Sequence, residues 1–97
     1  MARYRVSPKA QQDISEIGEF ISRDNPVRAL SFVRELRAKI ALTAETPLAY
    51  RERPELRLGI RASRHGVYLI FFRLEEAQVE VLRVWHGARD MSELFQD

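Results

Sequence analysis

Residues 7–26, SPKAQQDISEIGEFISRDNP, decide the fold because they contain the start signals of two helices. Ser7 and Asn25 are residues that cap helices, and each is followed by a proline, which suits the first helical position. Between these signals, apolar residues recur at spacings of four, three and four, which places them on one stripe of a helix. The stripe consists of Ala10, Ile14, Ile17 and Ile21, and the acidic residues Asp13, Glu16 and Glu19 fall largely outside it.

The segment after Pro26 predicts a second amphipathic helix. Its apolar stripe is carried by Ala29, Phe32 or Val33, Leu36, Ile40 and Ala44. This helix should end near Thr46, because Pro47 disfavours helical geometry in the residue before it. Two amphipathic helices joined by so few residues must fold back on each other as an antiparallel hairpin.

Apolar and polar residues alternate with a period of two on both sides of the hairpin, which is typical of strands. One strand is expected at residues 3–6 and three more at 56–62, 67–74 and 79–85, with turns at 63–66 and 75–78. Short turns imply antiparallel pairing. The sequence therefore predicts one α+β domain over residues 1–97. It consists of an N-terminal strand, an antiparallel helical hairpin and a three-stranded antiparallel meander, forming one sheet with the helices on one face.

The composition excludes several classes of site. The chain has no cysteine, so disulfides, thiolate metal sites and cysteine nucleophiles are ruled out. No phosphate loop, metal-ligand cluster or nucleophile motif is present, so we expect no cofactor and no metal. The N-terminus turns polar too soon for a signal peptide and no apolar run is long enough to span a bilayer, which favours a cytoplasmic location without membrane contact.

The face of the predicted sheet opposite the helices, here called the outer face, is the most informative surface. If Leu82 and Val84 point toward the helices, then Val79, Val81, Arg83 and Trp85 point outward, together with Arg57 and Arg61. Contiguous apolar patches mark interaction sites. Two coverings of this face stay open: the C-terminal tail folds back over it, or another chain docks there through a strand or a helix.

Two histidines and two arginines are the chemical candidates. His86 lies at the end of the last strand, where it either bonds to backbone or acts as an acid or base. His65 is expected to be a solvated turn residue. Arg61 and Arg83 are expected on the same outer face, where they would clamp a phosphate or grip an acidic partner. Arg89 is expected to pair with Asp90, and Asp90 to cap a short tail helix.

The chain resembles ParE toxins of the RelE/ParE superfamily over nearly its whole length. The resemblance is carried by Tyr4 to Ala10, Asp13-Ile14, Ile17, Asn25-Pro26, Ala29, Phe32, Pro47, Gly59-Ile60-Arg61, Tyr68-Leu69-Ile70 and, most specifically, Arg83 to Asp90. It implies the fold described above and the toxin of a type II toxin–antitoxin pair. ParE members are understood to act on DNA gyrase, whereas RelE members cut messenger RNA on the ribosome.

The resemblance also implies the site and the partner. A ribosome-dependent ribonuclease would use Arg61, Arg83 and His86. Members of that branch usually have a tyrosine near the C-terminus, and no tyrosine follows Tyr68 here, which favours gyrase inhibition without catalysis. A non-toxic binding module is the third alternative. The implied partner is a ParD-like, ribbon-helix-helix antitoxin in a hetero-oligomer, without sequence-specific nucleic-acid binding by the toxin alone. The residues expected to bind the antitoxin or target are Arg57, Arg61, Arg83, Trp85, His86 and Arg89.

Overall fold

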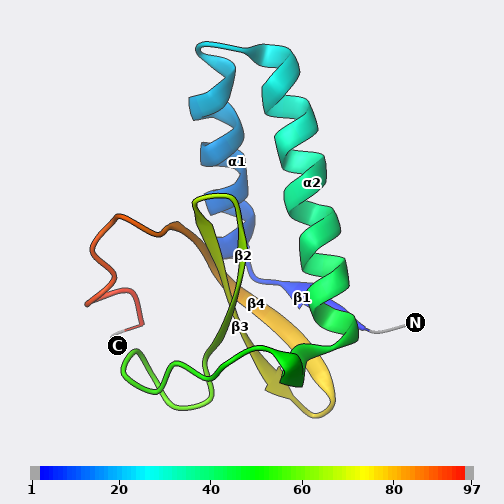
Figure 1. The fold of residues 1–97 in the computed structure, drawn as a ribbon, viewed down its shortest axis with the longest axis vertical. Coiled ribbons are helices and arrows are strands. Elements are labelled where there is room, and N and C mark those ends of the chain that lie inside the picture. Colours follow the sequence, from blue (N-terminus) through cyan, green and yellow to red (C-terminus); the bar gives the residue numbers. More distant parts are fainter. Residues whose placement is uncertain (1–2, 96–97) are drawn as a thin grey trace.

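The helical hairpin lies on one face of a four-stranded sheet in the computed structural model, which describes residues 3–95 (Figure 1). The elements in chain order are β1 (Tyr4–Val6), α1 (Pro8–Ser22), α2 (Pro26–Glu45), the 3₁₀ turn η1 (Pro47–Ala49), β2 (Arg61–His65), β3 (Tyr68–Glu75) and β4 (Gln78–His86). The strand order is β1-β4-β3-β2, with β1 parallel to β4 and the other pairs antiparallel. The predicted architecture is confirmed.

Both predicted helix starts are confirmed by their side-chain caps. The Ser7 hydroxyl accepts a hydrogen bond from the Ala10 N–H at 3.1 Å, and the Asn25 side-chain oxygen accepts one from the Arg28 N–H at 3.0 Å. Each bond satisfies a backbone donor that has no partner inside the helix. The second helix ends at Glu45, just before the predicted stop.

The strand predicted at residues 56–62 is wrong, because most of this segment is a loop. Pro54 lies in a turn, the Arg53 N–H donates to the Ile60 carbonyl at 2.6 Å, and Gly59 has a positive φ of 84°. The alternating Leu58 is consequently 83% exposed. The strand begins only at Arg61, and it includes three of the four residues that were predicted to form the next turn.

A β-bulge overturns the predicted facing of the last strand. Phe71 is opposite Arg83 but Phe72 is opposite Val81, which leaves Leu82 as an extra residue. A bulge of this kind inverts the alternation of side chains on one side of it. As a result, Val81 as well as Val84 faces the helices, whereas Leu82 packs on the outer face.

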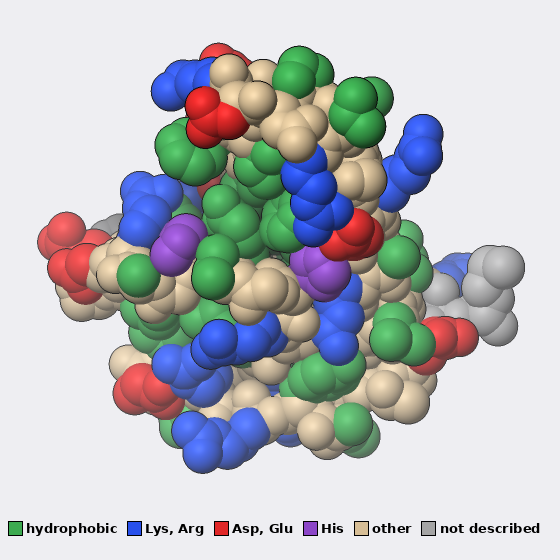
Figure 2. All heavy atoms as spheres, turned by 45° about the horizontal axis from the view of Figure 1, so that its top comes forward, with side chains coloured by type: hydrophobic (Ala, Val, Ile, Leu, Met, Phe, Trp, Pro, Cys, Tyr) green, Lys and Arg blue, Asp and Glu red, His purple; other side chains and the backbone are tan. Residues whose placement is uncertain are grey.

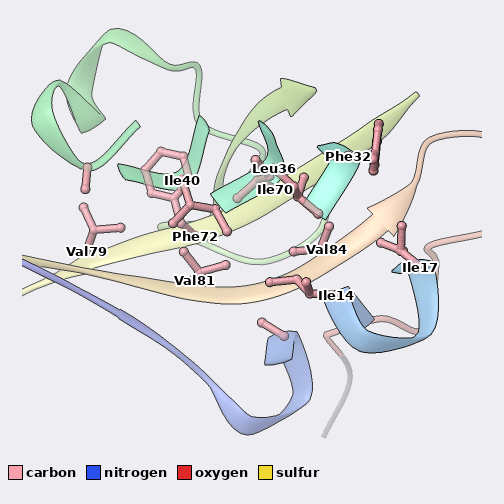
Figure 3. Packing of buried hydrophobic residues seen from close by; sticks show 12 residues of the cluster. Ile14, Ile17, Phe32, Leu36, Ile40, Ile70, Phe72, Val79, Val81 and Val84 are labelled. Atoms are coloured by element: carbon pink, nitrogen blue, oxygen red, sulfur yellow. The ribbon is translucent and has the colours of Figure 1, made fainter. Parts of the chain in front are cut away.

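The main core fills the space between the hairpin and the sheet (Figure 3). Ile14 and Ile17 from α1 and Phe32, Leu36 and Ile40 from α2 meet a floor of strand residues. That floor is formed by Ile70, Phe72, Val79, Val81 and Val84. Burial of these side chains is the dominant favourable term that holds the helices on the sheet.

The C-terminal tail covers the outer face, which confirms one of the two coverings left open by the sequence. Leu69 and Phe71 are buried there beneath a second cluster that includes Trp85, Met91, Leu94 and Phe95. The Phe95 ring meets the Phe71 ring edge-on, with centroids 5.4 Å apart. Residues 92–95 form a turn in place of the predicted tail helix.

None of the helices between residues 3 and 95 is long and apolar enough to cross a membrane.

Candidate functional site

The strand residue Arg83 forms a buried ion pair with Asp13 of α1. Its Nε–H and Nη2–H donate to the two Asp13 oxygens at 2.8 and 2.9 Å, and the Val84 N–H donates to Asp13 Oδ2 at 3.0 Å. Donation of these hydrogen bonds to the Asp13 carboxylate raises the pKa of Arg83 above its ordinary value. Arg83 is therefore already matched by a carboxylate within the chain.

The position of this ion pair follows from the end of β1. Ser7 still bonds to β4, since its N–H donates to the Val81 carbonyl at 2.9 Å and its hydroxyl donates to the Leu82 carbonyl at 3.0 Å. The chain then turns into α1, and the Asp13 carboxylate takes over the next donor on that strand edge. Sequence reasoning missed Asp13; the available signal is its spacing of three residues from Ala10 and four from Ile17, which places it at the border of the apolar stripe.

Trp85 is contacted by two arginines on the outer face. The guanidinium carbons of Arg83 and Arg89 lie 5.0 and 3.9 Å from its ring centroid, within the range of cation–π attraction. The predicted Arg89–Asp90 ion pair is absent from residues 3–95. Instead, Asp90 accepts the Ser92 N–H at 2.9 Å, which lowers the pKa of this carboxyl group.

Arg61 lies on the opposite face of the sheet from Arg83, so the prediction that they share a face is wrong. It is paired with Phe72, whose side chain points toward the helices, whereas Arg83 is paired with Phe71 on the outer face. Opposed residues of an antiparallel pair point to the same side. Arg61 donates to the Tyr50 carbonyl at 2.6 Å, and the two arginines cannot clamp a common phosphate.

His86 and His65 end a row of rings at the upper end of the sheet. Tyr68 contacts His86 at 5.3 Å and Phe32 at 5.6 Å, and Phe32 contacts His65 at 5.2 Å between ring centroids. Figure 2 shows both histidines on one face, with hydrophobic side chains between them. This row joins strands β2, β3 and β4 to α2.

Both histidines are bonded within the chain. His86 Nδ1 accepts the Ala88 N–H at 3.0 Å, which supports the interpretation of this residue as a strand-end anchor. His65 Nε2 lies 3.0 Å from Glu35, so the prediction of a solvated turn residue is wrong. Hydrogen bonds from Arg28 first, and then from His65, lower the pKa of Glu35.

A hollow of about 300 Å³ opens between α1 and the end of β4. It is lined by Asp13, Glu16, Ile17, Phe20, Tyr68, Val84, His86 and Arg89. The Phe20 side chain at its border is 62% exposed. The hollow therefore has an exposed aromatic group at its border.

A more voluminous hollow lies between the two helices. This interhelix groove has a volume of about 900 Å³. It is lined mainly by apolar and small groups, including Ile14, Gly18, Ala29, Leu30 and Val33, with Arg34 and Arg37 beside them. Gly18 also lines the groove, and a Cβ atom at this position would lie 3.1 Å from Cγ2 of Val33. The sequence analysis did not identify this groove.

These positions do not assemble a catalytic centre from the predicted residues. Of the ribonuclease set, Arg83 lies on the outer face, while Arg61 and His86 belong to the helix-facing side and are paired with Phe72 and Tyr68, four residues apart on β3. Within residues 3–95, no group of three histidine or acidic side chains is arranged to hold a metal ion.

Residues 4–91 match the family described as "ParE toxin of type II toxin-antitoxin system, parDE". The chain belongs to this family of toxins. It is also 33% identical over 87 residues to the toxin ParE1 of Caulobacter vibrioides, with 89% of this chain and 90% of that relative covered.

Solved structures of the superfamily share the fold. The chromosomal ParDE toxin–antitoxin system from P. aeruginosa contains a chain that matches with a TM-score of 0.75 and 19% identity, covering 89% of this chain and 96% of that one. A chain of the toxin–antitoxin complex RelBE2 from Mycobacterium tuberculosis matches with a TM-score of 0.63 and 23% identity, covering 88% and 96%. These ParE and RelE likenesses establish the architecture of the ParE-family toxin.

Proposed function

We propose that this ParE-family toxin inhibits DNA gyrase by binding it, and that a ParD-like antitoxin of the ribbon-helix-helix type neutralises it. The observation that carries the choice of gyrase is the separation of Arg61 from Arg83. A ribonuclease would need these cations to converge on one phosphate, and they lie on opposite faces of the sheet. The resemblance to ParE toxins points to DNA gyrase as the target instead.

The interhelix groove is the surface that best fits a docked antitoxin helix. Its floor is mainly apolar, Leu30 is 67% exposed, and Arg34 and Arg37 would face acidic side chains of the partner. Recognition of an amphipathic helix by a groove depends on this combination of apolar anchors and a charged rim. Here the helices, rather than the outer face of the sheet, take the antitoxin, because the tail already covers that face.

Two of the six residues predicted to bind a partner are exposed: Arg57 and Arg89. Arg61, Arg83, Trp85 and His86 are half-buried. We therefore assign contact with the target to Arg57 and Arg89, and a supporting role to the other four.

The test is to assay the purified toxin side by side against gyrase supercoiling and against translating ribosomes, with and without a ParD-like antitoxin. The proposal expects loss of supercoiling activity, intact messenger RNA, and recovery of supercoiling when the antitoxin is added. Cleaved messages with unaffected gyrase would show that the ribosome is the target. Normal activity of both would support the non-toxic binding module.

Leu30→Asp separates the binding of the antitoxin from the action on gyrase. This variant should still inhibit gyrase but should require at least about tenfold more antitoxin for recovery, because a charge would be buried in the apolar groove. Leu42→Asp is the matched control, since Leu42 is a 54% exposed leucine of the same helix that does not line the groove. Equal recovery of the two variants would contradict the assignment of the groove.

A further inference from the structure

The strand β2 forms an open edge of the sheet. His65 and Tyr68 close a two-residue turn, so that residues 61, 63 and 65 direct their backbone groups toward β3. The N–H and C=O of Arg64 therefore point away from the sheet. The outer side of this strand has a partner at its beginning, where Glu52 forms an isolated bridge with Arg61. Beyond it, the edge presents a donor and an acceptor to another strand.

A basic hollow of about 390 Å³, the β2-edge hollow, lies beside this edge. It is lined by the cations Lys39, Arg51, Arg53 and Arg64 and by groups that include Tyr50 and Leu69. None of its lining residues is acidic. The charge is concentrated here, although the chain as a whole has a formal net charge of only +2.

Two of the four cations are held by contacts within the chain. Lys39 lies 5.5 Å from the centroid of the Tyr50 ring, and Arg53 forms an ion pair with Glu55 at 2.6 Å. Within residues 3–95, no ion pair joins Arg51 or Arg64 to an acidic side chain. The hollow thus retains positive charge that can attract an anionic group.

We propose that the β2-edge hollow binds an extended, acidic peptide segment of another protein, which adds to β2 as a fifth strand. The backbone of the segment would pair with the N–H and C=O of Arg64, and its carboxylates would meet Arg51 and Arg64. Such strand addition obtains affinity from main-chain hydrogen bonds and specificity from side chains on alternate positions.

The strand edge favours a peptide over a nucleic acid as the occupant. The phosphates of a nucleic-acid backbone offer only acceptor oxygens to this edge, so a phosphate beside the Arg64 carbonyl would place two acceptors against each other. A peptide offers both a donor and an acceptor at the required spacing. The site shares no lining residue with the interhelix groove, so it stands independently of the antitoxin contact proposed there.

The experiment measures fluorescence anisotropy of a labelled peptide of about ten residues in which glutamate and valine alternate. Matched probes are a peptide in which lysine replaces glutamate and a single-stranded oligonucleotide of similar charge. The wild-type chain should bind the glutamate peptide and not the lysine peptide. The double variant Arg51→Gln and Arg64→Gln should weaken binding by about tenfold, whereas Arg23→Gln, at the exposed end of the hairpin, should leave it unchanged.

Arg64→Pro tests the strand addition itself. Proline is tolerated on an edge strand where the N–H points outward, so this variant should fold while it loses the charge and the donor. It should bind at least threefold more weakly than Arg64→Gln, which loses the charge alone. In the wild-type chain, the saturating peptide should also slow hydrogen exchange of the Arg64 amide, a measurement that does not depend on how the proline variant folds.

Equal binding by Arg64→Pro and Arg64→Gln, together with unchanged exchange of the Arg64 amide, would overturn the proposal. Binding of the oligonucleotide in preference to the glutamate peptide would overturn it as well, since the hollow would then be a phosphate site. Indifference of binding to the charges at positions 51 and 64 would exclude the hollow as the location of the peptide.

Discussion

Removal of the Asp13 carboxylate should destabilise the fold more than the loss of any exposed ion pair. Asp13→Ala leaves Arg83 without its partner and the Val84 N–H without its acceptor. The two side chains in the pair are only 9% and 19% exposed. Breaking a fully buried pair costs about 3–5 kcal/mol, and the residual hydration of Arg83 reduces this to about 2–4 kcal/mol. That is a large part of the 5–15 kcal/mol typical of a whole domain.

The assay is equilibrium urea denaturation followed by circular dichroism, with the free energy of unfolding extrapolated to water. The control is Glu35→Ala, which removes a carboxylate from an exposed cluster with Arg28 and His65 and should change stability much less. Arg83→Ala should also cost less than Asp13→Ala, because the Asp13 carboxylate would still accept the Val84 N–H.

A double-mutant cycle checks the physical reasoning. If the two side chains act through each other, the double variant Asp13→Ala and Arg83→Ala should be more stable than the sum of the single losses predicts, by about 1–3 kcal/mol. The reasoning is refuted if Asp13→Ala costs no more than Glu35→Ala. It is also refuted if the two losses simply add.

Three further outcomes are expected. Glu76 and Ala77 have positive φ angles of 51° and 64° in the β3–β4 turn. Replacing them with Asn and Gly should therefore stabilise the fold by about 1–2 kcal/mol and raise the thermal midpoint of unfolding. A lower midpoint would contradict this. Phe95→Ala should loosen the tail, with a loss of about 1–3 kcal/mol and stronger binding of a hydrophobic dye, and unchanged dye binding would show that the tail stays in place. Arg28→Gln should raise the pKa of Glu35, which NMR titration would measure, because the hydrogen bond from Arg28 is the main cause of its lowered pKa. In the wild-type chain, the stability that comes from this lowered pKa is present above the unfolded pKa of about 4.3. It is lost as the pH falls through the lower pKa of the folded state.

The helices and the final strands were predictable because their signals are local. Ser7 and Asn25 cap the helices with their own side chains, and Pro47 restricts the residue just before it. The loop at residues 53–60 was not predictable from alternation, because Leu56 and Leu58 have strand spacing while the backbone there turns at Pro54 and Gly59. A period of two is thus consistent with a strand without requiring one.

The candidate site was much less predictable than the fold. The motif from Arg83 to Asp90 indicated where the contacts gather, yet Asp13, the carboxylate that pairs with Arg83, lies 70 residues earlier in the chain. The sequence places Asp13 outside the apolar stripe of α1, and a charged residue outside such a stripe usually faces solvent. It is buried because the parallel strand β1 is only three residues long, which leaves the edge of β4 in need of an acceptor.

The amino-acid sequence by itself determined the order of the elements, the helix caps, the antiparallel hairpin and the resemblance to ParE toxins, because each depends on residues that are close together in the chain. Only the tertiary structure decided which face each strand residue occupies, because a single bulged residue, Leu82, inverts the alternation. It also decided that the tail covers the outer face and that Arg61 and Arg83 lie on opposite sides of the sheet. These outcomes depend on strand register and on burial against distant segments, which local patterns do not encode.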